Sequence, residues 1–150
     1  MKRGYFGIGI YHSKIEENIG TLWRSASSLG ADFIFTIGRR YKNQCTDTTK
    51  APRHIPLYHY NDWDDFFEHI PYGCPVVAVE LSEEAVPLES YHHMERCIYL
   101  LGAEDHGIPE EIMGRCKEII QIPGSQCFNV AVAGSIVMYD RVMKRCTIWK

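Results

Sequence analysis

The sequence contains no apolar run near the roughly 18 residues that a membrane-spanning helix needs. Its basic N-terminus is followed by an apolar stretch that stops at His12, which is too short and too rich in glycine for a signal peptide. It also has no internal repeat, low-complexity tract or interdomain linker. We therefore expect a single domain over residues 1–150, located in the cytoplasm and not associated with a membrane.

The sequence also lacks a Cys-x-x-C pair, although it has six cysteines. No histidine lies at metal-ligand spacing from any of them, and several lie in apolar stretches, where a free cysteine behaves as a small hydrophobic residue. The pattern therefore predicts neither a disulfide framework nor a bound metal. The cysteines are Cys45, Cys74, Cys97, Cys116, Cys127 and Cys146.

A large excess of one charge is absent too, since the formal net charge is −3. The distribution is nevertheless uneven: residues 1–53 carry +5, residues 54–113 carry −12 and residues 114–150 carry +4. A mildly acidic protein of this kind can still present a positive face to a polyanion. A solvated surface with uneven charge explains the same distribution equally well.

What the sequence does contain is an alternation of strand and helix patterns. Apolar and β-branched stretches predict strands at 5–11, 31–37, 75–81, 97–101 and 118–122. Apolar residues at helical spacing, the second set capped by Asn61, predict helices at 17–29, 61–69, 109–116 and 128–144. The polar stretch 39–56 predicts a long loop. The alternation predicts an α/β fold with a mostly parallel sheet and helices on both faces.

Three short segments, far apart in the sequence, each place a small or amide residue beside a polar side chain. The first contains Asn18, Gly20 and Arg24, at the expected start of a helix. Asn18 and Arg24 lie about 120° apart around an ideal helix, but the first turn after a strand is where α/β proteins bind ligands. Arg24 offers a forked, permanently charged donor for a phosphate or a polarised oxygen. The alternative is a helix cap and a surface arginine.

The second segment runs from Leu101 to Gly107 and follows a predicted strand. Gly102 and Gly107 permit close backbone approach and positive φ, and Glu104 supplies an acceptor. An ordinary strand-to-helix turn would have the same pattern. His106 is a candidate general base, but the sequence supplies no partner for it, so we expect it on the surface.

The third segment runs from Ile122 and Pro123 to Phe128 and Asn129, where the last helix opens. Asn129 suits a helix cap, a ligand contact or both roles together. The small apolar residues at 130–137 predict close packing, against the core, a threaded loop or a second subunit.

In this order the patterns N-x-G-x-x-x-R, L-G-x-E-x-x-G and I-P…N-V-x-V-A resemble the three motifs of the SpoU/TrmH family of RNA 2′-O-ribose methyltransferases, in the SPOUT superfamily. The resemblance covers about residues 7–141. It implies an α/β domain whose C-terminal segment forms a deep trefoil knot, an exception to the rule against knotted chains. It also implies a homodimer that uses S-adenosyl-L-methionine, releases S-adenosyl-L-homocysteine and needs no metal.

The resemblance further implies roles for individual residues. Arg24 would be the catalytic residue, while Asn18, Glu104 and Asn129 would shape the site and position the substrate. Because an arginine stays protonated at neutral pH, we expect Arg24 to orient the reacting hydroxyl and the neighbouring phosphate. The implied cofactor-binding residues are Leu81, Leu101, Gly102, Glu104, Gly107, Ile122, Pro123, Phe128 and Asn129.

Two features depart from the family pattern. Cys127 stands where the family usually has serine, and the stretch from Pro123 to Asn129 is shorter than in many members. The N-terminal RNA-binding extension of larger relatives is also missing, so we expect this domain to bind a structured RNA itself, tRNA in preference to rRNA. The candidate RNA-binding residues are Arg39, Arg40, Lys42, Lys50 and Arg53.

Two other functions are compatible with the sequence. A non-catalytic RNA-binding or cofactor-binding homodimer fits the modest net charge and Cys127. A flavodoxin-like nucleotide-binding or signalling domain fits the composition, but it predicts a monomer and leaves the third segment without a role.

Overall fold

A computed structural model describes residues 4–41 and 54–145 of the chain. Seven strands form one sheet in the order β3-β2-β1-β6-β4-β7-β5, and every strand pair is parallel. The strands are β1 (Tyr5–Tyr11), β2 (Phe33–Ile37), β3 (Leu57–Tyr60), β4 (Val76–Val79), β5 (Val86–Pro87), β6 (Arg96–Leu101) and β7 (Glu118–Gln121). The helices are α1 (Glu16–Leu29), α2 (Trp63–His69), α3 (Glu110–Met113) and α4 (Val130–Arg145), with single 3-10 turns η2 (Pro71–Gly73) and η3 (Leu88–Ser90).

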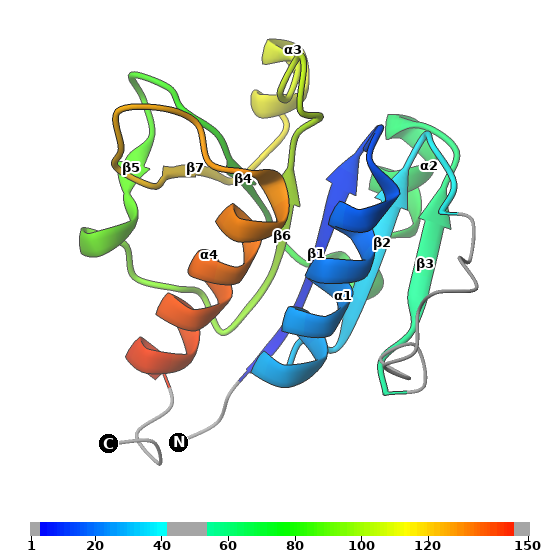
Figure 1. Ribbon diagram of the computed structural model, residues 1–150, viewed down its shortest axis with the longest axis horizontal. Coiled ribbons are helices and arrows are strands. Elements are labelled where there is room, and N and C mark those ends of the chain that lie inside the picture. Colours follow the sequence, from blue (N-terminus) through cyan, green and yellow to red (C-terminus); the bar gives the residue numbers. More distant parts are fainter. Residues whose placement is uncertain (1–3, 42–53, 146–150) are drawn as a thin grey trace.

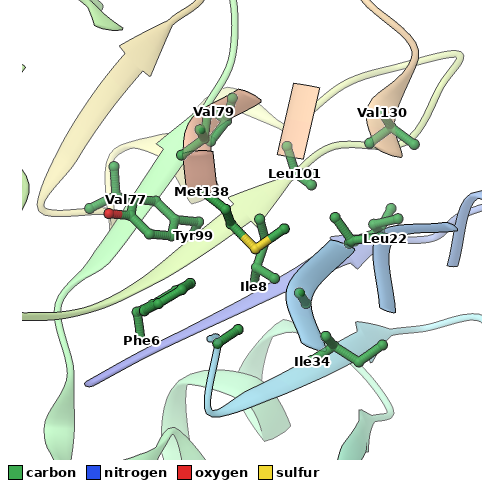
Figure 2. Packing of buried hydrophobic residues seen from close by; sticks show 14 of the residues in the cluster. Phe6, Ile8, Leu22, Ile34, Val77, Val79, Tyr99, Leu101, Val130 and Met138 are labelled. Carbon is green, nitrogen blue, oxygen red and sulfur yellow. The ribbon is translucent and has the colours of Figure 1, made fainter. Parts of the chain in front are cut away.

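Helices cover both faces of the sheet, which confirms the predicted α/β architecture. Helices α1 and α4 lie side by side on one face, and α2 lies on the other (Figure 1). One core cluster joins α1 and α4 to residues such as Ile8, Tyr99 and Leu101 of the central strands, and Figure 2 shows this packing. A second cluster joins Phe66 of α2 and Ile112 of α3 to the opposite face. The central strands are mostly apolar, as expected where both faces of a sheet are buried.

The predicted close packing of the last helix is confirmed at Gly134. A Cβ atom at this position would lie 2.5 Å from Leu22 Cδ1 and 2.9 Å from Leu101 Cδ1. The absence of a side chain therefore allows α4 to approach α1 and β6 closely. This contact fixes the start of α4, and with it the third segment, against the first two segments.

The connection from β4 to β6 encloses β7. It leaves β4, pairs with the outer edge of β7 as β5, and returns to β6 on the other side of β4. Helix α4 is fastened to this connection, because buried Arg141 donates to Met94 O at 2.7 Å and to Glu95 O at 2.8 Å. Lys144 Nζ donates to Leu88 O at 2.6 Å.

Some local predictions were wrong or incomplete. The cap of α2 is Asp62, whose side chain accepts from Asp65 N at 2.8 Å, and not Asn61. Elements β3, β5 and η3 were not predicted, because each is only two to four residues long. No helix in the ranges 4–41 and 54–145 is both long and apolar enough to cross a membrane.

Candidate functional site

The three segments meet at the carboxyl ends of β1, β6 and β7, which are neighbours or near neighbours in the sheet. A chain of side-chain hydrogen bonds joins them. Asn129 Nδ2 donates to Asn18 Oδ1 at 3.0 Å, and Asn18 Nδ2 donates to Glu104 Oε1 at 2.8 Å. Asn18 is only 6% exposed and lies at the centre of this chain. The structure therefore brings together three of the four predicted catalytic residues.

The Glu104 carboxylate also holds the loop that leads from β1 into α1. Ser13 Oγ donates to Glu104 Oε1 at 3.0 Å, and Lys14 N donates to Glu104 Oε2 at 3.3 Å. Partial burial pushes the pKa of Glu104 upward, but the hydrogen bonds from Asn18, its own backbone, Lys14 and Ser13 outweigh burial and lower it. Glu104 is thus anionic near neutral pH and already surrounded by donors.

An ion pair reinforces the same junction between the first two segments. Lys14 Nζ contacts Asp105 Oδ2, and this contact lowers the pKa of Asp105. Ser13 and Lys14 were not predicted as site residues, because a serine and a lysine in a strand-to-helix loop carry no signal of a partner about 90 residues away. His106 is exposed, as expected.

Asn129 has the capping role that the sequence allowed, and its side chain also contacts the first segment. Its Oδ1 atom accepts from Ala131 N at 2.9 Å and from Val132 N at 3.2 Å, which caps α4. Its Nδ2 atom takes no part in the cap and donates to Asn18 Oδ1. The cap orients the amide, so the start of α4 sets the position of the hydrogen-bond chain.

The second segment is a tight backbone turn that requires glycine. Gly107 has φ +64°, and a Cβ atom there would lie 2.4 Å from Glu80 Oε2. A Cβ atom at Gly102 would lie 2.5 Å from the carbonyl carbon of Gly107. Glu80 accepts from Ile108 N at 3.1 Å and from Leu81 N at 3.1 Å, so it ties this turn to the end of β4. Glu80 was not predicted as a site residue.

A small cavity of about 80 Å³ lies between the end of β4 and the third segment. The predicted cofactor residues Leu81, Ile122 and Phe128 line it together with Cys127. Leu81 and Phe128 are 45% and 43% exposed, which is high for large apolar side chains. Pro123 is exposed next to Ile122, whereas Leu101 is buried in the core and contributes through its position before Gly102. The site thus combines an apolar wall with two glycines at which a ligand can approach the main chain, beside a cavity smaller than a whole nucleoside.

Arg24 lies apart from this cluster. It is exposed on α1, and within residues 4–41 and 54–145 it forms no hydrogen bond or ion pair. Of the predicted RNA-binding residues, Arg39 and Arg40 are exposed directly after β2. Lys42, Lys50 and Arg53 lie outside the described residues.

Metal ligands are not gathered at this site. Across the part of the chain that the structure describes, no group of three or more His, Cys, Asp or Glu side chains is placed to hold a metal ion. Cys74, Cys97, Cys116 and Cys127 are free thiols.

A family model described as the SpoU rRNA methylase family matches residues 6–139. The chain belongs to this family. The match includes all three segments and the strands that position them, so membership rests on the site as well as on the sheet. The SpoU family assignment also agrees with the resemblance seen in the sequence motifs.

Individual SpoU relatives show how far the similarity extends. The tRNA (cytidine(34)-2′-O)-methyltransferase of Ancylobacter novellus is 26% identical over 144 residues, covering 87% of each chain. The tRNA (guanosine(18)-2′-O)-methyltransferase of Escherichia coli K12 is 22% identical over 134 residues, which cover 85% of this chain and 58% of the relative. This chain therefore spans less than two thirds of the length of the second relative.

A solved structure confirms the fold. The AdoMet-bound rRNA methyltransferase from Sinorhizobium meliloti superposes with a TM-score of 0.82 at 21% identity, covering 97% of this chain and 59% of that one. At this identity the match supports the α/β fold and the strand order, not the activity.

Proposed function

We propose that the protein transfers a methyl group from S-adenosyl-L-methionine to a ribose 2′-hydroxyl of a structured RNA, with tRNA favoured over rRNA. The observation that carries the proposal is the hydrogen-bond chain from Asn129 through Asn18 to Glu104, which joins the three SpoU motif segments beside an apolar cavity. The preference for tRNA draws support from the tRNA methyltransferase of Ancylobacter novellus, which matches this chain over 87% of both lengths.

The cofactor would lie across the second and third segments. Leu81, Ile122 and Phe128 would contact its adenine, and the backbone at Gly102 and Gly107 would approach its ribose. When bound, it supplies a methyl group on a sulfonium, and the group that departs is a neutral thioether. This leaving group needs no metal for charge neutralisation.

Glu104 would act by positioning and not as a base. Its carboxylate already accepts from Ser13, Lys14 and Asn18, and its lowered pKa makes it a weaker base. Asn18 and Asn129 would hold the cofactor loop against the first segment. Arg24 would bind the phosphate next to the target ribose and orient the 2′-hydroxyl.

Arg24 would reach a site in a homodimer. A groove of about 310 Å³ between α1 and α4 is almost wholly apolar, and Thr21, Val132 and Tyr139 are among the residues that line it. Val132 and Tyr139 are 45% and 57% exposed. Arg24 lies three residues after Thr21 and so on the same side of α1. A second copy docked on this groove would therefore bring Arg24 close to its partner's site.

The knot would follow from the enclosing connection between β4 and β6. Helix α4 hydrogen-bonds to that connection through Arg141 and Lys144 after the chain has passed β7. Such an arrangement supports threading of the C-terminal segment through the loop.

Methyl transfer from labelled S-adenosyl-L-methionine to total tRNA and to rRNA tests the function. We expect labelled 2′-O-methylated nucleotides from tRNA. The label should be lost in Arg24→Ala but not in Arg96→Gln, which removes a positive charge at the amino end of β6, away from the carboxyl ends of the strands. No incorporation into either RNA by folded protein that binds the cofactor would favour a non-catalytic binding protein.

A complementation experiment tests the dimer. At a cofactor concentration that leaves Asn129→Ala nearly inactive, mixing it with inactive Arg24→Ala should restore about a quarter of wild-type activity, because half of the dimers are mixed and each holds one intact site. If no activity is recovered after subunit exchange, Arg24 acts in the site of its own chain or acts in neither site.

A further inference from the structure

A second and larger hollow lies at the opposite end of the sheet from the cofactor cavity. It has a volume of about 530 Å³ and is lined by all four residues of β3 together with residues that follow β2 and α2. Strand β3 ends the sheet on this side, and no described strand pairs with its outer edge, as Figure 1 shows. The volume is within the range of sites that hold a small ligand or one nucleotide.

The walls of the hollow carry aromatic rings on both faces of the edge strand. Tyr58 packs against Phe33 with ring centroids 5.2 Å apart, yet it is 41% exposed. Tyr41 lies on the α1 side, where its ring meets the edge of Trp23 at 6.0 Å. An aromatic ring that is supported from one side and exposed on the other is a platform on which a nucleic-acid base can stack.

The polar groups of the hollow suit a phosphate and a base edge. Arg40 is exposed and lines the hollow. His59 Nδ1 is hydrogen-bonded to Thr36 Oγ1 at 2.8 Å, which fixes its ring, and burial together with the Arg40 charge lowers the pKa of His59. Arg40 is therefore the dominant cation here, because His59 is mostly neutral near pH 7. His69, on the α2 side, is paired with Asp65.

The hollow adjoins the first motif segment. A Cβ atom at Gly20 would lie 3.7 Å from Tyr41 Oη, so Tyr41 reaches α1 between Asn18 and Arg24. Strands β1 and β3 are two positions apart in the sheet, about 10 Å at the usual strand spacing. A ligand in the hollow would thus lie beside the helix that carries Arg24.

We propose that this hollow binds one unpaired nucleotide of the substrate RNA, a few nucleotides along the strand from the one that is methylated. The proposal rests on the function proposed above and adds a substrate class to it, an RNA with an unstacked base near its target ribose. Tyr58 stacks on the base, Arg40 binds the phosphate and the β3 edge faces the sugar. A continuous duplex does not fit, because both faces of each of its bases are covered by neighbours.

Fluorescence anisotropy with the full-length protein and labelled RNA tests the proposal. The probes are a short single-stranded oligoadenylate and a blunt duplex of the same length, with saturating S-adenosyl-L-homocysteine. We expect tighter binding of the single strand. Tyr58→Ala should weaken it roughly 5- to 150-fold, whereas Tyr58→Phe keeps the ring and should match the wild type. Arg40→Gln should weaken binding and reduce the slope of log affinity against log salt concentration by about one phosphate contact. Arg96→Gln should change neither the affinity nor this slope.

The following results would contradict the proposal. Equal affinity of wild type, Tyr58→Ala and Arg40→Gln for the single strand would overturn the proposal, as would tighter binding of the duplex. Because Tyr58 packs on Phe33, Tyr58→Leu serves as a variant that keeps apolar contact without a ring, and it should bind as weakly as Tyr58→Ala. If the wild type transfers methyl groups and the variants bind RNA as tightly as the wild type, the proposed role of the hollow is refuted but the proposed function is not. Absence of cofactor binding in the wild type would refute the proposed function instead.

Discussion

Replacing Glu104 with glutamine removes one charge and turns one acceptor atom into a donor while leaving the shape of the side chain unchanged. In the wild type, Oε1 accepts from Ser13 and Asn18, and Oε2 accepts from Lys14 N. A glutamine oxygen can keep the first two bonds, but its amide then faces the Lys14 N–H. One hydrogen bond is lost and two lose their ionic character. We expect a loss of about 1–2 kcal/mol in the free energy of unfolding, at the lower end of what these bonds allow because Glu104 is exposed.

The pH dependence of this loss separates the carboxylate from a general packing effect. The folded-state pKa of Glu104 is lowered, so its contribution to stability is present above its ordinary pKa and is lost as the pH falls through the lowered value. The difference between wild type and Glu104→Gln should therefore be largest near neutral pH and shrink below about pH 4.

Urea denaturation at neutral and acidic pH measures both quantities. Glu83→Gln, at an exposed position between β4 and β5, is the matched control and should unfold like the wild type at neutral pH. The reasoning is refuted if Glu104→Gln is as stable as the wild type at neutral pH, or if its deficit is the same in acid.

Three further predictions concern packing, titration and backbone geometry. Gly134→Val should lower the free energy of unfolding by about 1–3 kcal/mol in a urea denaturation experiment, because the valine side chain enters space held by Leu22 and Leu101. An unchanged unfolding midpoint would contradict this packing. Burial lowers the pKa of His93 to about 4, so stability should rise between about pH 4 and 6.5, by about 3 kcal/mol at most. His93→Gln should flatten that slope, and an equal slope in both proteins would rule out His93 as its source. Gly107→Ala should weaken S-adenosyl-L-homocysteine binding in calorimetry, because φ of +64° is strained for alanine and the new Cβ would displace Glu80; unchanged affinity would show that this turn does not hold the cofactor.

The sequence predicted the parts of the fold and site that depend on local patterns. Apolar runs indicated the central strands. The resemblance of the three segments to the SpoU/TrmH motifs implied that Asn18, Glu104 and Asn129 shape one site, and the structure brings these residues together. Asn18 and Arg24 were expected in one site despite their 120° separation on a helix. Asn18 points into the hydrogen-bond chain, whereas Arg24 does not contact it.

The missed features depend on contacts between distant residues. Nothing local to Ser13 or Glu80 marks a partner, because each is defined by a loop that folds onto it from 91 or 28 residues away. Arg141 is 1% exposed although it is charged, because the carbonyls of Met94 and Glu95 and the rings of Phe6 and Tyr99 surround it. An arginine on a helix otherwise indicates a position that is exposed to solvent.

Calorimetric titration of S-adenosyl-L-methionine into wild type, Asn129→Ala and Ser125→Ala tests most directly whether the three segments form one cofactor site. The account predicts binding by the wild type and by Ser125→Ala, an exposed neighbour in the same segment. Asn129→Ala should bind roughly tenfold more weakly, since it loses the cap of α4 and the hydrogen bond to Asn18. Absence of binding by the folded wild type, or equal affinity in Asn129→Ala, would contradict the account.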